Sequence, residues 1–208
     1  MTPTHFLPTI LESLEPKLPV PVVYNCGGYE KVETLRQLEG KVQIYLPDLK
    51  YVSEEAAWRY SHARNYFAVA TAAIREMFRQ TGPYEMDETT GLLKKGVIIR
   101  HMILPGMTED SKRIIDWVAE NFAPGQVLFS LMRQYVPCGQ AKEGKYPEIG
   151  RPLAEEEYQE VEDYLFQSPH RGWLRPGGRF RRQPVHPALR WDGNKKGLTV
   201  DRGRLTML

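Results

Sequence analysis

The 208-residue chain has an ordinary composition for a globular protein, with 41% hydrophobic and 11% aromatic residues. It has no apolar run near the roughly 20 residues that span a bilayer, and no basic and apolar segments of a secretory signal at its start. Its two cysteines, Cys26 and Cys138, are too far apart for a zinc ribbon, a CxxC redox pair or a disulfide framework. We therefore expect a cytoplasmic protein without a membrane partner.

The net charge of +2 conceals an asymmetry between the two ends of the chain. Residues 1–170 contain 18 Lys and Arg against 24 Asp and Glu, whereas residues 171–208 contain 10 against 2. A basic tail therefore follows an acidic body.

Short apolar runs alternate with helical patterns as far as about residue 166. Residues 21–24 predict a buried strand, and a helix is expected near 29–38. A second strand is expected at 42–46, before Pro47. Ser53 is a suitable N-cap for the next helix, and a further helix is expected near 64–80.

The second half of the chain continues this alternation. An irregular loop or hairpin is expected at 83–96, and the strongest predicted strand is at 96–104. Thr108 or Asp110 is expected to cap a helix that extends to about residue 122. A strand at 127–132 and a helix at 153–166 follow. Strands separated by helices predict βαβ units, and therefore an α/β fold with a parallel sheet.

Polar residues gather where the predicted strands end, which is where parallel α/β sheets bind their ligands. The strand ends carry Asn25-Cys26-Gly27-Gly28, Pro47-Asp48-Leu49-Lys50, Arg100-His101 and Gln134-Tyr135. Asp48 and Lys50 are two positions apart, so an extended backbone points both the same way. They could contact a ribose or a carboxylate, or form a surface ion pair.

Arg100 and His101 are neighbours on an otherwise apolar strand, so one of them is expected to face the interior. A buried arginine needs a partner, and a structural histidine is more common than a catalytic one. Gly27 and Gly28 could let a ligand approach the backbone, but a tight turn explains them equally well.

Taken together, these residues resemble the radical S-adenosylmethionine (SAM) proteins related to the pyruvate formate-lyase activating enzyme. The matching stretches run in the family's order over nearly all of residues 2–168. They are TPTHFLPTIL (2–11), PVVYNCGGYEKVETLRQLEG (21–40), IYLPDLKY (44–51), YSHARNYFAVATAAIREMFRQTG (60–82), RHMILPG (100–106) and LMRQYVP (131–137).

The resemblance implies an incomplete radical SAM-type (β/α) barrel over residues 1–168. In this family a CxxxCxxC loop binds a 4Fe-4S cluster, the cluster chelates SAM, and reductive cleavage of SAM yields a 5′-deoxyadenosyl radical. By the same resemblance, the candidate site residues that lie around the SAM and substrate cavity are Asn25, Asp48, Lys50, Arg100 and His101.

The sequence departs from the family in its cysteines. Three thiolates must hold such a cluster and leave one iron open for SAM, but Cys26 and Cys138 lie far apart and outside the family's cluster loop. The family usually has valine before TPTH, and a valine GTG codon read as a start would give Met1. We therefore expect an internal start in a longer frame, and a chain that does not build the cluster alone.

The resemblance stops near Ser168, and residues 169–208 form a basic Arg/Gly/Pro-rich tail that we expect to be irregular and disordered. A one-nucleotide shift from His170 onward allows back-translation to the family's IEDGYVQ and FDGTG segments. The codons of Trp173 and Trp191 then force glycines at the positions where the family has them. We interpret the tail as frameshifted; the competing interpretation is a basic arm for nucleic acid, which we do not favour.

Three hypotheses for function follow. The chain is a truncated, inactive fragment of an activase-like radical SAM enzyme, or it is one half of a split enzyme. The partner would then be an N-terminal cluster-bearing half or a protein substrate. The third hypothesis is a non-catalytic binding protein with a nucleic-acid-binding tail.

Overall fold

The computed structural model describes residues 4–13 and 18–167. The predicted frameshifted tail lies outside these residues. The chain divides into two compact units. The first comprises Met1–Leu49, Ser53–Arg100 and Gly125–Leu128, and the second comprises Lys50–Val52, His101–Pro124 and Phe129–Leu208.

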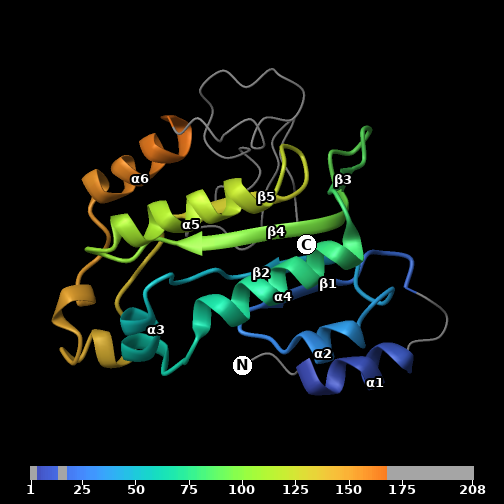
Figure 1. The fold of residues 1–208 in the computed structure, drawn as a ribbon, viewed down its shortest axis with the longest axis horizontal. Coiled ribbons are helices and arrows are strands. Elements are labelled where there is room, and N and C mark those ends of the chain that lie inside the picture. The colour runs from blue at the N-terminus through green and yellow to red at the C-terminus, as the bar shows by residue number, and fades with distance from the viewer. Residues whose placement is uncertain (1–3, 14–17, 168–208) are drawn as a thin grey trace. The chain divides into compact units, whose positions relative to one another are not determined.

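The sheet has five strands, and the α/β prediction is confirmed (Figure 1). The strands are β1 (Val23–Cys26), β2 (Ile44–Pro47), β3 (Glu85–Met86), β4 (Leu93–Met102) and β5 (Leu128–Met132). Their order is β1-β2-β4-β3, and β5 also pairs with β4. The β1–β2 and β2–β4 pairs are parallel, and β3 pairs with β4 in the antiparallel direction. Over the described residues the sheet is largely parallel and not closed.

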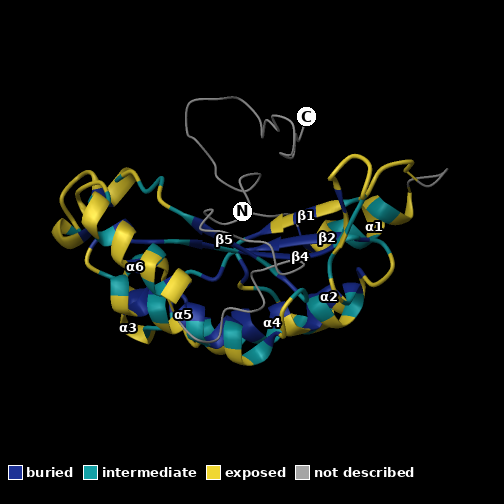
Figure 2. Ribbon diagram, turned by 90° about the horizontal axis from the view of Figure 1, so that it is seen from above, coloured by how far each residue is buried: buried dark blue, intermediate teal, exposed yellow. Residues whose placement is uncertain are grey.

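The helices of the first unit are η1 (Thr4–Phe6), α1 (Leu7–Glu12), α2 (Val32–Arg36), α3 (Glu54–Ser61) and α4 (Tyr66–Thr81). The Ser53 side chain accepts a hydrogen bond from the Ala56 amide, which confirms the predicted N-cap. In α4, Ala70, Ile74 and Met77 recur at helical spacing and are fully buried. Figure 2 shows α2 and α4 on one face of β1, β2 and β4.

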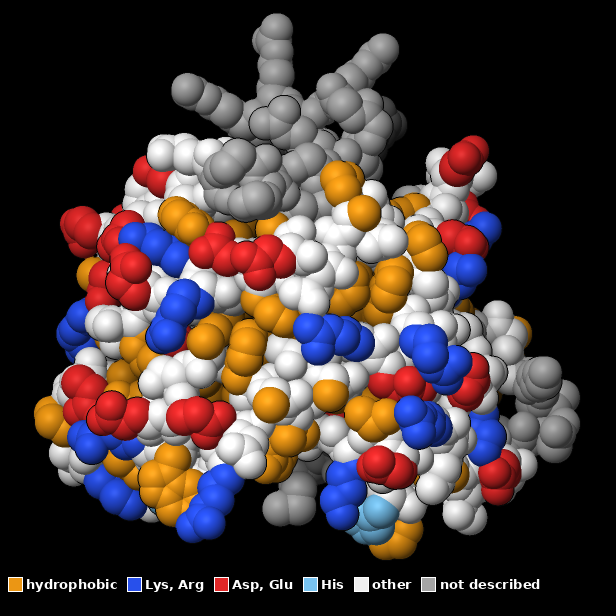
Figure 3. Space-filling view, in the orientation of Figure 1, with side chains coloured by type: hydrophobic (Ala, Val, Ile, Leu, Met, Phe, Trp, Pro, Cys, Tyr) orange, Lys and Arg blue, Asp and Glu red, His pale blue; other side chains and the backbone are white. Residues whose placement is uncertain are grey.

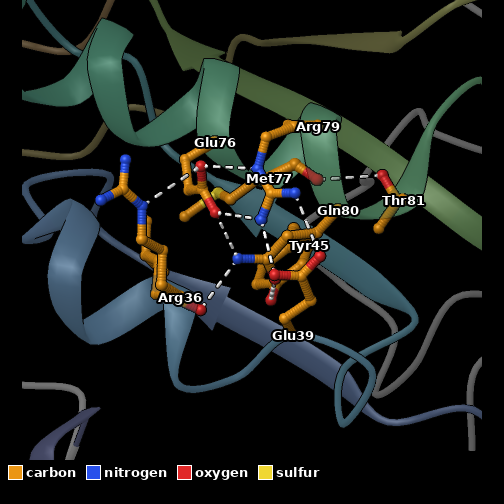
Figure 4. Close-up of polar contacts among 9 residues, drawn as sticks. Arg36, Glu39, Tyr45, Glu76, Met77, Arg79, Gln80 and Thr81 are labelled. Atoms are coloured by element: carbon orange, nitrogen blue, oxygen red, sulfur yellow. Dashed lines mark hydrogen bonds and ion pairs between the residues drawn. The ribbon is translucent and has the colours of Figure 1, made fainter.

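A charged network joins α4 to the end of α2 and to β2 (Figure 4). Its centre is Glu76, which is only 6% exposed and accepts from Arg79 and Gln80. The Arg79 guanidinium also binds both carboxylate oxygens of Glu39. The Tyr45 hydroxyl, from β2, donates to Gln80. These groups are hydrogen-bonded to one another, so we assign the network to holding the helices on the sheet.

In the second unit, α5 (Thr108–Asn121) contacts α6 (Glu155–Gln167). Two short 3-10 helices, η2 (Gly139–Ala141) and η3 (Pro147–Ile149), precede α6. The predicted caps of α5 are wrong, because Met107 occupies the N-cap position without a side-chain bond. Asp110 lies inside the first turn and is only 5% exposed, where it accepts from the Val52 amide and Arg113.

Two further features differ from the sequence prediction. Strand β4 begins at Leu93, three residues before the predicted start, because it forms a hairpin with β3. Gly96 therefore lies inside the strand, with a φ of 131° and the backbone of Tyr84 where a side chain would be. Helix α1 has no counterpart in the predicted elements. No helix among the described residues is long and apolar enough to cross a membrane.

Candidate ligand-binding site at the carboxyl ends of the strands

Three parallel strands of the first unit end side by side, and each brings a polar residue to the same edge. Asn25 lies opposite Leu46 in the β1–β2 register. Directly after β2, Asp48 forms an isolated parallel bridge with Arg100 of β4. The Asp48 amide donates to Cys26 O at 3.0 Å, and the Leu49 amide donates to Arg100 O at 2.8 Å. Backbone pairing therefore fixes the positions of Asn25, Asp48 and Arg100.

The side chains of these three residues form one hydrogen-bonded cluster. Nη2 of Arg100 donates to Asp48 Oδ1 at 2.5 Å and to Asn25 Oδ1 at 2.7 Å. The side chains of Arg100 and Asp48 are 25% and 18% exposed. The ion pair is thus partly shielded from water and still reachable by a solute. We call Asn25, Asp48 and Arg100 the edge cluster.

The edge cluster contains a buried donor that the described residues do not use. Nε of Arg100 is buried and has no hydrogen-bond partner within the described part of the chain. A buried polar group without a partner is costly, so such an atom needs an explanation. An oxygen of a bound ligand or a water molecule would satisfy it.

The loop after β1 packs closely against the backbone of Asp48. Gly28 has a φ of 80°, and a Cβ at this position would lie 1.9 Å from Asp48 O. The Tyr66 hydroxyl donates to Asp48 O at 3.1 Å and is 3.3 Å from Gly27 O. Tyr29 stacks on Tyr66 and donates to Arg64 O. Gly28 therefore serves a turn that packs against the backbone of Asp48.

Cys26 is the last residue of β1, and its thiol is expected to be unreactive. Its side chain is 3% exposed, and burial raises the pKa of the thiol to about 12. Metal ligation and nucleophilic attack need the thiolate, which is scarce at neutral pH under these conditions. Cys138 is exposed and belongs to the second unit.

A second polar cluster, absent from the sequence prediction, lies next to the turn. Glu30 accepts from the Tyr24 hydroxyl at 3.2 Å and from Thr4 Oγ1 at 3.3 Å, and Thr4 and Tyr24 are also hydrogen-bonded to each other. Burial raises the pKa of Glu30. The only signal in the sequence is the position of Glu30 two residues after the glycine pair, which does not identify its partners.

The remaining predicted site residues belong to the second unit. His101 is 2% exposed, and its Nε2 lies 2.8 Å from Ser111 Oγ. This bond accounts for the buried histidine without a ligand. Lys50 is half-buried, two residues before Val52, whose amide is held by Asp110. The structure thus brings Asn25, Asp48 and Arg100 together, and the roles of Lys50 and His101 stay predictions.

The side chains of the described residues can be compared with what the two cofactors implied by the resemblance, a 4Fe-4S cluster and SAM, require. No group of three His, Cys, Asp or Glu residues that could hold a metal ion exists among the described residues. The two cysteines therefore do not fit a 4Fe-4S cluster, which needs three adjacent thiolates. The edge cluster does fit part of SAM, since carboxamide, carboxylate and guanidinium groups complement ribose hydroxyls and an amino-acid moiety.

Comparison with known proteins gives one informative similarity. The chain is 32% identical over 165 residues to a protein of Methanocaldococcus jannaschii that bears the name uncharacterized protein MJ0674. The match covers 78% of this chain and 42% of that protein, so the chain spans less than half of its relative's length. No family model matches the chain.

Proposed function

We propose that the described residues form the C-terminal part of a radical SAM-type (β/α) barrel, and that the edge cluster contacts SAM or the substrate. The observation that carries this proposal is the meeting of Asn25, Asp48 and Arg100 at the carboxyl ends of parallel strands. The same strands carry the family's NCGGYE, DLK and RHMILPG segments.

The chemistry of the edge cluster supports a polar, oxygen-bearing ligand. Nη2 of Arg100 is occupied by Asp48 and Asn25, so these residues fix the guanidinium in one orientation. Nε of the same group is buried and has no hydrogen-bond partner among the described residues. The Asp48 carboxylate is an acceptor that complements a ribose hydroxyl.

We propose that this chain alone does not catalyse the radical reaction. In the family, the cluster and SAM together supply reductive cleavage, and neither cysteine here is suited to hold that cluster. In an intact or assembled enzyme, the role of the edge cluster is to bind and orient the ligand. The cysteines would come from another segment or another polypeptide.

Calorimetric titration of the 208-residue chain with SAM and with S-adenosylhomocysteine tests the ligand. We expect weak binding of both, and its loss in Asp48→Asn. Glu33→Gln, an exposed carboxylate on α2, is the matched control and should bind like the parent chain. Equal binding by all three proteins would overturn the assignment of the edge cluster.

Anaerobic incubation with iron and sulfide tests the statement about the cofactor. We expect no 4Fe-4S absorbance in the visible range and no cleavage of SAM after reduction. A stoichiometric cluster that disappears in Cys26→Ala would contradict the proposal that the chain is inactive alone.

The alternative of a nucleic-acid-binding protein rests on residues outside the described ranges. On the face drawn in Figure 3, Lys and Arg side chains are interspersed with Asp and Glu rather than gathered in a patch. This distribution gives no support to a phosphate-binding surface there.

A further inference from the structure

Aromatic and cationic side chains meet on the surface of the first unit, from the turn after β1, from α3 and from the loop that joins α3 to α4 (Figure 1). Trp58 is 48% exposed and Tyr29 is 47% exposed. The Arg64 guanidinium lies over the Trp58 ring, 4.9 Å from its centroid, and the His62 ring meets the same indole edge-on at 5.4 Å. The Tyr29 hydroxyl donates to Arg64 O at 2.8 Å. We call Tyr29, Trp58, His62 and Arg64 the aromatic patch.

The backbone of the aromatic patch is fixed by bonds within the first unit. In the described part of the chain, the non-glycine residues with a positive φ are His62, at 50°, and Asn65, at 53°. The His62 amide donates to Trp58 O at 3.0 Å, and the Asn65 amide donates to Glu54 Oε2 at 2.9 Å. Two left-handed residues three positions apart, each bonded to α3, hold this loop in one conformation. A preorganised loop loses little conformational entropy when a partner binds.

Tyr29 presents one face of its ring to solvent. The other face stacks on Tyr66, with ring centroids 5.9 Å apart and an interplanar angle of 10°. Tyr66 is 2% exposed, so the exposed half of Tyr29 lies away from it. Tyr66 also donates to Asp48 O, so the aromatic patch adjoins the backbone that carries the edge cluster. An aromatic face with a buried ring behind it is a rigid surface for a flat or aliphatic group.

Arg64 differs from other arginines in having no acidic partner among the described residues. Arg113 pairs with Asp110 and Arg133 pairs with Glu155, whereas within residues 4–13 and 18–167 no carboxylate pairs with Arg64. Its contact with the Trp58 ring uses none of the guanidinium N–H donors in a hydrogen bond. A carboxylate is the group that accepts two of these donors at once.

The residue types of the aromatic patch favour a protein partner over a nucleic acid. Trp, Tyr and Arg are the residues that dominate the binding energy of protein–protein interfaces. Stacking on Tyr29 next to Arg64 would also suit a nucleotide base. However, residues 1–170 contain 18 Lys and Arg against 24 Asp and Glu, so the net charge of this part of the chain opposes a polyanion. One carboxylate on a partner matches Arg64 without a chain of phosphates.

We propose that the aromatic patch binds a segment of a partner protein that carries an Asp or Glu beside an aromatic side chain. The partner's carboxylate pairs with the Arg64 guanidinium, which Trp58 holds in place. The partner's ring packs on the exposed face of Tyr29. This docking surface lies outside the edge cluster and does not depend on the ligand proposed there.

Nuclear magnetic resonance titration of the 208-residue chain tests this proposal. The probes are the capped peptides acetyl-Ser-Glu-Phe-Ser-amide and acetyl-Ser-Gln-Phe-Ser-amide, which differ in one charge. The indole N–H signal of Trp58, assigned with Trp58→Phe, and the amide signals of Tyr29 and Arg64 report on the patch. We expect the Glu peptide to shift these signals with a Kd of about 1 mM, and the Gln peptide to bind roughly tenfold more weakly. Absence of shifts with the Glu peptide, or equal affinities, would overturn the proposal.

Two substitutions separate a specific ion pair from general attraction to positive charge. Arg64→Gln removes the proposed partner of the carboxylate, and Lys31→Gln removes an exposed cation two residues after Tyr29. We expect Arg64→Gln to weaken binding of the Glu peptide about tenfold and Lys31→Gln to change it less than about twofold. Equal losses in the two variants would overturn the proposal. Their melting temperatures report whether both are folded.

Two other occupants of the aromatic patch are separate outcomes of the same titration. Uridine monophosphate is the nucleotide probe, and tighter binding of it than of the Glu peptide would assign the patch to nucleotides and overturn the proposal. Shifts of the Trp58 signal on concentrating the chain alone would assign the patch to a second copy, with the same consequence. None of these readouts involves SAM, so their failure leaves the edge-cluster proposal to its own titration.

Discussion

Arg100 and Asp48 form an ion pair across the backbone bridge that extends the β2–β4 pairing to the carboxyl edge of the sheet. The backbone bond from Leu49 to Arg100 O and the side-chain bond from Arg100 to Asp48 join the same two strands. The guanidinium is thereby held in one orientation at this edge of the sheet.

This relationship predicts the effect of Asp48→Asn on stability. The variant leaves Arg100 partly buried without its countercharge, so we expect the free energy of unfolding to fall by about 1–3 kcal/mol. Urea denaturation at neutral pH measures the change. The exposed-site control, Glu33→Gln, should stay within about 0.5 kcal/mol of the parent chain. A variant as stable as that control would show that the ion pair contributes nothing.

The elements of the sheet were predictable because each has a local signature. The apolar runs near 21–24, 42–46 and 127–132 are strands within a few residues of their predicted bounds. Helix α1, with six residues, is too short to show a periodicity, and its position depends on Thr4 and Glu12 contacting distant residues. The start of β4 at Leu93 is set by its local hairpin with β3.

The edge cluster was predictable only in part, for a related reason. Asn25, Asp48 and Arg100 follow the rule that ligands bind at strand ends, and the resemblance selected them among the residues there. Sequence spacing pointed Asp48 and Lys50 in the same direction, but it gave no sign of the ion pair between Asp48 and Arg100. Strand register, which no single segment encodes, decides that contact. The bond from the Tyr66 hydroxyl to the Asp48 carbonyl has no sequence signal.

The two cysteines are expected to differ in reactivity. Burial raises the pKa of Cys26 to about 12, so its thiolate is scarce at pH 8 and the side chain is hard to reach. Cys138 is exposed. Brief treatment with iodoacetamide followed by peptide mass spectrometry should therefore modify Cys138 alone, and both residues in urea. Equal modification of the folded chain would contradict the buried position of Cys26.

Glu157 is expected to make the second unit sensitive to acid. Its carboxylate accepts from Arg151 and from the amides of Gly106 and Ala154, and the Arg151 guanidinium is the main cause that lowers its pKa to about 2. Because the pKa of Glu157 is lower in the folded protein than in the unfolded chain, the carboxylate stabilises the fold at any pH above the unfolded pKa. This stabilisation is lost as the pH falls towards 2.

Glu157→Gln should therefore reduce the free energy of unfolding by about 2 kcal/mol at pH 7. The difference from the parent chain should shrink as the pH falls from about 5 to about 2. Glu156→Gln, an exposed neighbour on α6, is the matched control and should show neither effect. Urea denaturation across this pH range measures both, and a pH-independent difference would assign the loss to geometry instead of charge.

The network around Glu76 gives a graded prediction. Glu76 is buried and accepts from Arg79 and Gln80, so Glu76→Gln should lower the free energy of unfolding by about 1–2 kcal/mol. Glu39→Gln removes an exposed partner of the same arginine and should cost less. Thermal melts at low and high salt compare the two variants. The reverse order would mean that the exposed carboxylate holds Arg79 in place.

The turn that supports the edge cluster can be tested with two glycines of similar backbone conformation. Gly28 has a φ of 80° and Gly40 a φ of 76°, so alanine is strained at both. A Cβ at Gly28 would lie 1.9 Å from Asp48 O, whereas a Cβ at Gly40 meets nothing within 4 Å.

Gly40→Ala should lower the free energy of unfolding by about 1 kcal/mol, from the backbone strain alone. Gly28→Ala should cost roughly 3 kcal/mol or more, because the turn must also move away from Asp48. Urea denaturation gives both values, and because the strain is matched, their difference isolates the packing of the turn on the site. Equal losses would mean that the turn gives way without disturbing Asp48, and that Gly28 serves chain reversal only.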